Sequence, residues 1–124
     1  MIKKRFFKKK ISSYAWGHFV EKYVAFCLFF KGYKVLERNY KPKSGTGQGE
    51  VDLILKKGKT LIFVEVKYRK TLSSSKEAIF QKSLLRLSKT AKVVAAKHPS
   101  FDFRVDAVCV HHFFLFEHVK NITM

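Results

Sequence analysis

Residues 49–69 read GEVDLILKKGKTLIFVEVKYR, and this stretch has the clearest structural pattern in the chain. On the near side of a lysine- and glycine-containing turn, Val51, Leu53 and Leu55 alternate with polar positions. On the far side the same alternation recurs, with apolar residues at positions 62, 64 and 66. A period of two predicts half-buried strands, and two such strands separated by a short turn predict a hairpin.

The register of this hairpin is limited, because a slip of one residue would turn one apolar set toward water. The pairing that we expect sets Leu55 opposite Thr60, which places Glu50 opposite Glu65 and Asp52 diagonal to Glu65. Directly opposed like charges destabilise a sheet, and diagonal neighbours still interact. Converging carboxylates suit a hard divalent cation with oxygen ligands, so the pattern predicts bound Mg²⁺ or Mn²⁺.

The charge of the whole chain makes an acidic cluster unusual. The 124 residues include 26 Lys and Arg against 9 Asp and Glu, for a net charge of +17, and 47% of them are apolar. This composition predicts a folded basic domain, with nucleic acid as the first candidate partner and an anionic membrane surface as the second. The alternative is that Glu50, Asp52, Glu65 and Lys67 are only the solvated face of a hairpin, but three of nine acids on one patch argue against it.

Outward from the hairpin, the chain divides into a basic arm (residues 1–12) and one domain (residues 13–124). A stretch from Ser12 or Ser13 to Lys31 is apolar on most sides, which predicts a buried helix ended by Gly32. A glycine-containing loop at 41–49 is expected to move or to let a phosphate backbone approach. The other expected elements are a strand at 33–40, a helix at 75–98 and strands at 103–111 and 113–119. The order is helix, three strands, helix and two strands, a mixed α/β fold.

Several features carry smaller expectations. The longest apolar run, at 23–30, is too short to span a bilayer, and no cleavage site follows the basic start, so we expect a cytoplasmic protein. Cys27 and Cys109 are expected to be buried free thiols. His111 and His112, as neighbours on a strand, cannot chelate one metal together. Asp106 could be a structural acceptor or a distant site residue, and the phenylalanines are expected in the core, among them Phe26, Phe29, Phe113, Phe114 and Phe116.

The segments GEVDLI (49–54) and FVEVKYR (63–69), separated by the hairpin turn, resemble the YraN family of predicted endonuclease-like proteins. That family is similar to archaeal Holliday junction resolvases and to the restriction-endonuclease-like superfamily with its PD-(D/E)xK signature. The resemblance extends from about Gly17 onward, although Val51 stands where the signature has proline. It implies a restriction-endonuclease-like core, with a mixed central sheet flanked by helices.

The resemblance also implies roles for individual residues. Asp52 and Glu65 would be metal ligands together with the main-chain carbonyl of Val66, and the hairpin pattern adds Glu50. Lys67 would orient or deprotonate the attacking water, or stabilise the transition state.

Helical residues would complete the site. Glu21 stands where the family's first helix contributes a further acid, and its alternative is a buried ion pair. Gln81 or Lys82 could supply the polar residue that related resolvases carry at the start of the second helix, although Lys82 equally belongs to the basic stripe of that helix.

The predicted function is a metal-dependent phosphodiester hydrolase, an endonuclease acting on structured or branched DNA. The alternatives are a non-catalytic nucleic-acid-binding module of the same fold and a purely electrostatic RNA binder. DNA is the expected partner, RNA is attracted by the same charge, no membrane partner is expected, and a homodimer is consistent with the resemblance to resolvases. The residues expected to hold phosphates are Lys41, Lys43, Lys56, Lys57, Lys59, Arg69, Lys70, Lys82, Arg86 and Lys89.

Overall fold

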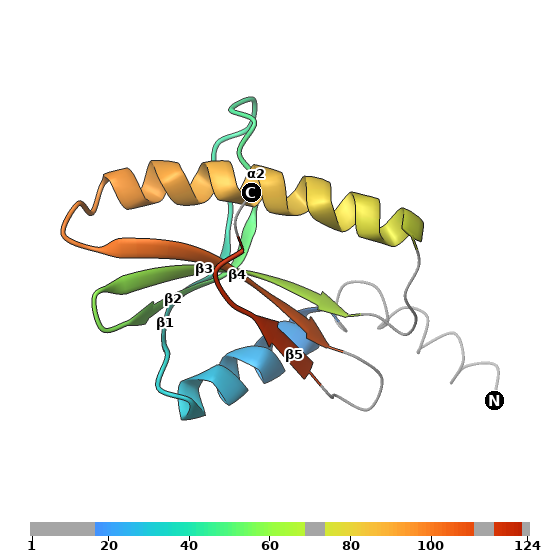
Figure 1. The fold of residues 1–124 in the computed structure, drawn as a ribbon, viewed down its shortest axis with the longest axis horizontal. Helices are drawn as coiled ribbons and strands as arrows, with labels where there is room; N and C mark the ends of the chain where they lie inside the picture. The colour runs from blue at the N-terminus through green and yellow to red at the C-terminus, as the bar shows by residue number, and fades with distance from the viewer. Residues whose placement is uncertain (1–16, 69–73, 111–115, 123–124) are drawn as a thin grey trace.

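The computed structural model describes residues 17–68, 74–110 and 116–122 (Figure 1). Five strands form one mixed sheet, in which neighbours along the chain are also neighbours in space. The pair β3–β4 is parallel and the other three pairs are antiparallel. The elements are helical residues 17–30, β1 (Lys34–Tyr40), β2 (Val51–Lys57), β3 (Thr60–Tyr68), α2 (Ser74–Ala96), β4 (Asp102–Val110) and β5 (Phe116–Val119). The predicted α/β class, with a mixed sheet flanked by helices, is confirmed.

The first helix ends where its sequence predicts. Gly32 adopts a φ of 95°, a conformation that glycine reaches without strain. The amide of Tyr33 donates to the carbonyl of Leu28 at 3.1 Å, and the amide of Gly32 donates to the carbonyl of Phe29 at 3.1 Å. This pair of bonds is a Schellman motif, which satisfies the last helical carbonyls and turns the chain into β1.

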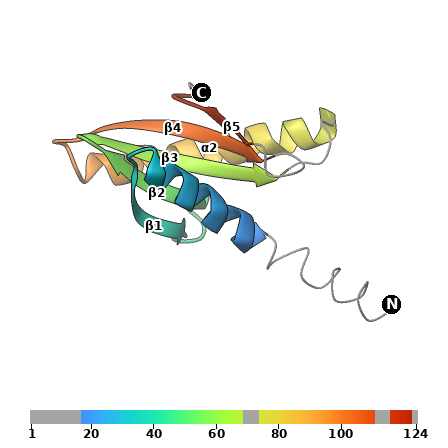
Figure 2. The same cartoon turned by 90° about the horizontal axis from the view of Figure 1, so that it is seen from below.

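The helices cover opposite faces of the sheet (Figure 2). One face packs Leu53 and Val64 against Val20, Val24 and Leu28 of the first helix. The other face packs its own apolar side chains against the predicted stripe of α2; this second core includes Ile54, Phe63, Phe80, Leu84, Leu87 and Ala91. The prediction of half-buried strands is therefore wrong for β2 and β3, because α2 buries the face that was expected to meet water.

The hairpin register differs by two residues from the predicted one. Leu55 pairs with Ile62 and Lys57 pairs with Thr60, so the turn contains only two residues. Gly58, at its first position, has a φ of 61°, as glycine has in the tight turns that match the twist of a hairpin. The same apolar residues still share a face, which is why the sequence pattern did not distinguish the two registers.

The first helix is not buried, contrary to prediction. Phe26, Phe29 and Phe30 are 63%, 62% and 71% exposed, because the sheet covers one side of the helix only. Phe26 and Phe29 are thus not core residues. Cys27 and Cys109 are free as predicted, but they are partly rather than fully buried. The residues at 111–115 and the side chain at position 116 lie outside the described part, and so does the basic arm.

Candidate functional site

Asp52 lies where the ladder between β2 and β3 stops. Leu53 and Val64 form its last pair, and continuing that register by one residue sets Asp52 opposite Glu65. Beyond this pair the amide of Val66 donates to Asp52 Oδ2 at 2.8 Å. The carboxylate therefore takes the place of a strand neighbour and is fixed beside β3.

Glu65 comes from the α2 face of β3 and is only 8% exposed. Ser83 of α2 donates its hydroxyl to Glu65 Oε1 at 3.1 Å. Sequence reasoning missed Ser83 and favoured Gln81 or Lys82 for the polar position on this helix. Gln81 is exposed and lies two residues from Ser83, which places it on the other side of the helix.

Two adjoining hollows open beside these acids. The larger, of about 720 Å³, lies between α2, the 41–49 loop and β2, and both Asp52 and Glu65 line it. The smaller, of about 570 Å³, is lined by Glu21 of the first helix, and Asp52 and Glu50 line both hollows. The structure thus gathers all four predicted acids in one region, although no three Asp, Glu, His or Cys side chains of the described residues lie close enough to hold a metal ion as they stand.

Nearby positive groups compensate these acids only in part: His18 Nδ1 lies 3.9 Å from Glu21 Oε1, and Lys67 acts on Glu65. Burial, followed by repulsion among the carboxylates, raises the pKa of Asp52 and of Glu65 to about 7. Burial also raises the pKa of Glu21, whose Oε1 atom has no hydrogen-bond partner among the described residues. Carboxylate oxygens are ligands that Mg²⁺ and Mn²⁺ prefer, and such a cation, if these side chains closed around it, would offset both the burial and the repulsion.

Lys67 and Val66 follow Glu65 on β3. Lys67 is half-buried, and its charge lowers the pKa of Glu65. Val66 packs its side chain on the core beneath the first helix, while its amide holds Asp52. The role of the Val66 carbonyl as a ligand stays a prediction.

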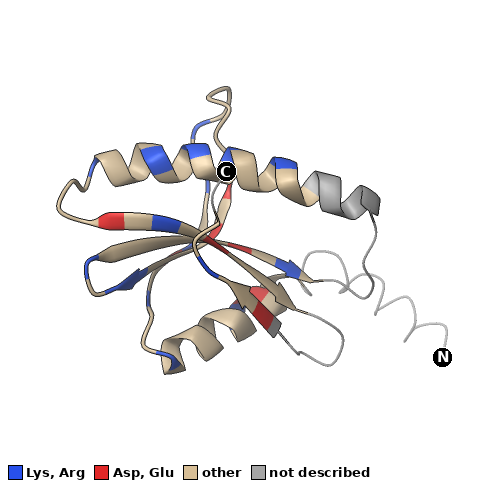
Figure 3. Cartoon of the chain, viewed as in Figure 1, with Lys and Arg blue, Asp and Glu red and all other residues tan. Residues whose placement is uncertain are grey.

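The basic residues divide into two groups. Lys41, Lys43, Lys82 and Arg86 line the larger hollow, and Lys and Arg recur along α2, which includes the exposed Lys89 (Figure 3). The predicted phosphate contacts at Lys56, Lys57 and Lys59 instead lie at the hairpin turn. There the Lys57 ammonium stands 4.5 Å from the centre of the Tyr33 ring, and Lys56 stands 5.4 Å from that of Phe101. Arg69 and Lys70 lie outside the described residues.

Gly49 joins the loop at 41–49 to α2. Its amide donates to the Arg86 carbonyl at 2.9 Å, and its carbonyl accepts from the Thr90 hydroxyl at 2.6 Å. A Cβ atom at Gly49 would lie 2.8 Å from that of Arg86. Gly49 thus allows a close contact between the loop and the helix three residues before Asp52, and the expected mobility or phosphate approach of this loop stays a prediction.

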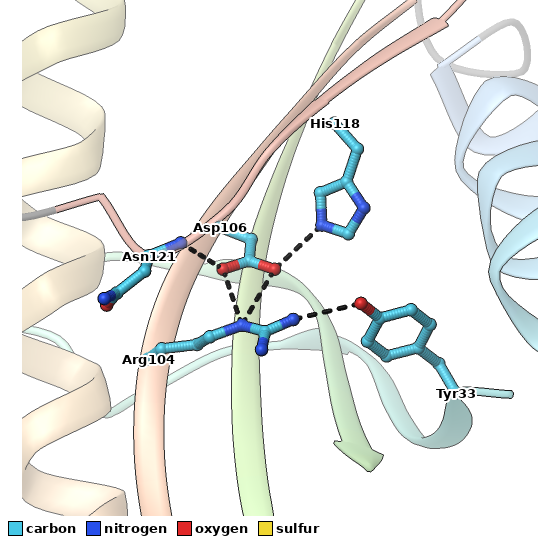
Figure 4. A network of polar contacts seen from close by, with 5 residues as sticks. All are labelled: Tyr33, Arg104, Asp106, His118 and Asn121. Carbon is cyan, nitrogen blue, oxygen red and sulfur yellow. Dashed lines mark hydrogen bonds and ion pairs between the residues drawn. The ribbon is translucent and has the colours of Figure 1, made fainter. Parts of the chain in front are cut away.

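Asp106 belongs to a separate network on β4 (Figure 4). Its fully buried carboxylate accepts from Arg104 Nε at 3.1 and 3.2 Å, from His118 Nε2 at 2.8 Å and from the Asn121 amide at 2.8 Å. Arg104 also donates to the Tyr33 hydroxyl at 3.0 Å. Burial alone would raise the pKa of Asp106, but the bonds from His118, Asn121 and Arg104 together lower it. Of the two roles left open by the sequence, these contacts favour the structural acceptor.

Comparison with known proteins identifies the family of the chain. Residues 20–110 match the model of the uncharacterised protein family UPF0102, which is the YraN family. The chain belongs to this family. A UPF0102 protein of Methylobacterium nodulans is 33% identical over 106 residues, covering 83% of this chain and 79% of the relative. The UPF0102 protein of Methylorubrum extorquens is 40% identical over 86 residues, covering 67% and 64%. One from Fusobacterium nucleatum is 38% identical over 80 residues, covering 61% and 64%.

The residues that match UPF0102 include the whole of β2 and β3 and all four acids of the site, from Glu21 to Glu65. The resemblance inferred from the two motifs is confirmed. Within the described part of the chain, neither helix has the length and apolar character needed to cross a bilayer.

Proposed function

We propose that this UPF0102 protein is a metal-dependent phosphodiester hydrolase that cuts structured or branched DNA, built on a restriction-endonuclease-like core. One observation carries the proposal: the partly buried Asp52 and the buried Glu65, on neighbouring strands, line the same hollow as Lys41, Lys43, Lys82 and Arg86. Buried acids without matching cations are unfavourable for folding, so their presence favours a functional role.

The four cations that line the larger hollow, here called the basic rim, favour a phosphodiester as the substrate. Lysine and arginine side chains hold a nucleic-acid backbone through its phosphates and carry no sequence information. These four cations line the hollow beside the acids, and within the described part of the chain none of them forms an ion pair with Asp52 or Glu65; Arg86 donates to the Gln48 carbonyl at 3.5 Å. A phosphate backbone bound across the rim would therefore lie over Asp52 and Glu65.

Different side chains of the protein would have different roles in the reaction. Asp52, held by the Val66 amide, and Glu65, held by the Ser83 hydroxyl, would bind Mg²⁺ or Mn²⁺, with Glu50 and Glu21 nearby. When bound, such an ion lowers the pKa of a water molecule and neutralises charge on the scissile phosphate. Lys67 would stabilise the negative charge that develops on the phosphate oxygens, or orient the attacking water.

Calorimetric titration with Mn²⁺ tests the metal site. We expect Asp52→Asn and Glu65→Gln each to weaken Mn²⁺ affinity by at least about tenfold. Asp102→Asn and Glu37→Gln are the matched controls, because both remove an exposed carboxylate elsewhere on the sheet. Equal affinity in all five proteins would refute a metal site at these acids.

A cleavage assay tests the reaction. Four-way junctions, flaps and linear duplexes of DNA are incubated with the protein and Mg²⁺, alongside a duplex of RNA. We expect cleavage of the branched DNA, and a loss of about 10²-fold in Lys67→Ala. Cleavage at the same rate by Lys67→Ala would contradict a role for Lys67, because it would come either from a contaminating nuclease or from a mechanism that does not use this side chain.

The second candidate is a nucleic-acid-binding module without turnover. The absence of a three-ligand group among the described residues favours it, since the acids would have to move to hold an ion. Junction binding with wild-type affinity in Asp52→Asn, together with no cleavage by either protein, would establish this alternative.

A further inference from the structure

An exposed aromatic surface lies on the first helix. Phe26, Phe29 and Phe30, here called the phenylalanine patch, are 62–71% exposed. The rings of Phe26 and Phe30 lie 4.9 Å apart and those of Phe29 and Phe30 lie 5.7 Å apart, so the three form a continuous apolar surface. Contiguous exposed apolar patches of this kind mark interaction sites.

The surroundings of the phenylalanine patch are basic. Lys22, Lys31, Lys34 and Lys57 are all exposed, and the Lys57 ammonium donates to the Lys31 carbonyl at 3.4 Å at the end of the helix. Residues 22–36 contain no Asp or Glu. Charge complementarity therefore requires an anionic partner.

The charge and the ring geometry exclude two other occupants. A second copy of this chain would bring another net charge of +17 against the same basic surroundings. Single-stranded nucleic acid stacks its bases on open aromatic faces. The patch instead has its rings edge to face, at 67° and 86°, so that the edge of one ring lies against the face of its neighbour.

We propose that the phenylalanine patch docks the protein on an anionic lipid surface. Phenylalanine has no polar atom and enters the boundary between headgroups and acyl chains, while flanking lysines contact the anionic headgroups. The first helix packs on the sheet face opposite α2, so lipid contact leaves the hollow beside α2 accessible (Figure 1). Phe26 and Phe29 were expected in the core, and a membrane surface, although second among the candidate partners, was not adopted as one. The exposure of the phenylalanine patch is the reason to propose a membrane partner now, and this proposal does not depend on the nuclease proposal.

Vesicle flotation of the full chain tests the docking. Vesicles of 30% phosphatidylglycerol in phosphatidylcholine are compared with vesicles of phosphatidylcholine alone, at roughly 0.1 M salt where exposed charges still act. We expect the wild type to float with the anionic vesicles at least about tenfold better than with the neutral ones. Flotation with neither kind would overturn the proposal.

Matched variants separate the patch from general charge. We expect Phe26→Ser/Phe30→Ser to lower flotation at least about fivefold, and Leu85→Ser/Val93→Ser, two exposed apolar residues of α2, to float like the wild type. Unchanged flotation of the phenylalanine variant would overturn the proposal, and so would a loss of single-stranded DNA affinity with flotation intact. Should that variant fail to fold, Lys22→Glu/Lys31→Glu must lower flotation instead. Asp52→Asn is expected to float normally, so a failure of the nuclease proposal is distinguishable.

Discussion

Asp52 is partly buried and Asp106 is fully buried, and the pKa values of these two aspartates move in opposite directions. Burial acts on both in the same sense, by penalising the charged form. Asp106 accepts hydrogen bonds from Arg104, His118 and the Asn121 amide, whereas Asp52 accepts one from Val66 and faces Glu21 and Glu65. The difference shows that hydrogen-bond and charge partners, rather than the extent of burial, set the direction of each pKa shift. Asp106 has the partners that a structural carboxylate needs, whereas Asp52 does not.

The largest expected effect comes from Asp106→Asn. The amide keeps one acceptor but loses the charge that compensates Arg104, so we expect the free energy of unfolding at pH 7 to fall by about 3 kcal/mol. Urea unfolding measures it. Asp102→Asn, an exposed carboxyl on the same strand, should stay within about 0.5 kcal/mol of the wild type. A cost below about 1 kcal/mol for Asp106→Asn would break the comparison.

A smaller loss of folding stability is expected from Gly49→Ala, which disturbs the backbone contacts three residues before Asp52. The new Cβ would lie 2.8 Å from that of Arg86 and 3.0 Å from helix backbone atoms, so we expect a loss of about 2 kcal/mol. Gly17→Ala is the control, since it has no atom within 4 Å of its Cβ and should be neutral or slightly stabilising. Equal stability of the two variants would mean that Gly49 does not hold the site.

The smallest effect has the opposite sign. The pKa of Asp52 is raised to about 7, so the folded state binds more protons than the unfolded one, and stability falls as pH rises from about 4 to about 7. Asp52→Asn should remove part of this slope and gain about 1 kcal/mol at pH 8. Asp106 behaves inversely: its stabilisation is present above its unfolded pKa, near 3.8, and is lost as pH falls below that value. Unfolding curves from pH 3 to 8 compare both variants with the wild type, and a loss of stability in Asp52→Asn at pH 8 would contradict the assigned shift.

Much of the fold follows from local patterns. The α2 stripe was predictable because Phe80, Leu84 and Leu87 recur with the helical period, and the end of the first helix because Gly32 takes a conformation that other residues avoid. The acids of the site were predictable for a similar reason. Asp52 and Glu65 interrupt apolar strands of a basic chain, Glu50 directly precedes the first of them, and the two strands are close in sequence.

The rest depends on distant neighbours. The two hairpin registers bury the same strand face, so only the turn geometry at Gly58 separates them. Exposure of Phe26 depends on how wide a strip of the helix the sheet covers, which no local pattern contains. Ser83 was missed because one helical position changes the direction of a side chain by about 100°. The partners of Asp106 are up to 15 residues away in the sequence and have no spacing motif.

The chain's late residues give the Asp106 network a consequence for synthesis. Asn121 supplies a donor to the carboxylate, and the amide of Ile122 donates to the Val105 carbonyl at 2.7 Å. A nascent chain halted before residue 118 would hold an acid inside the sheet without its histidine or its Asn121 contact. Residues 118–122 must therefore be synthesised before β4 has all its partners, and truncations that remove them should behave as folding defects.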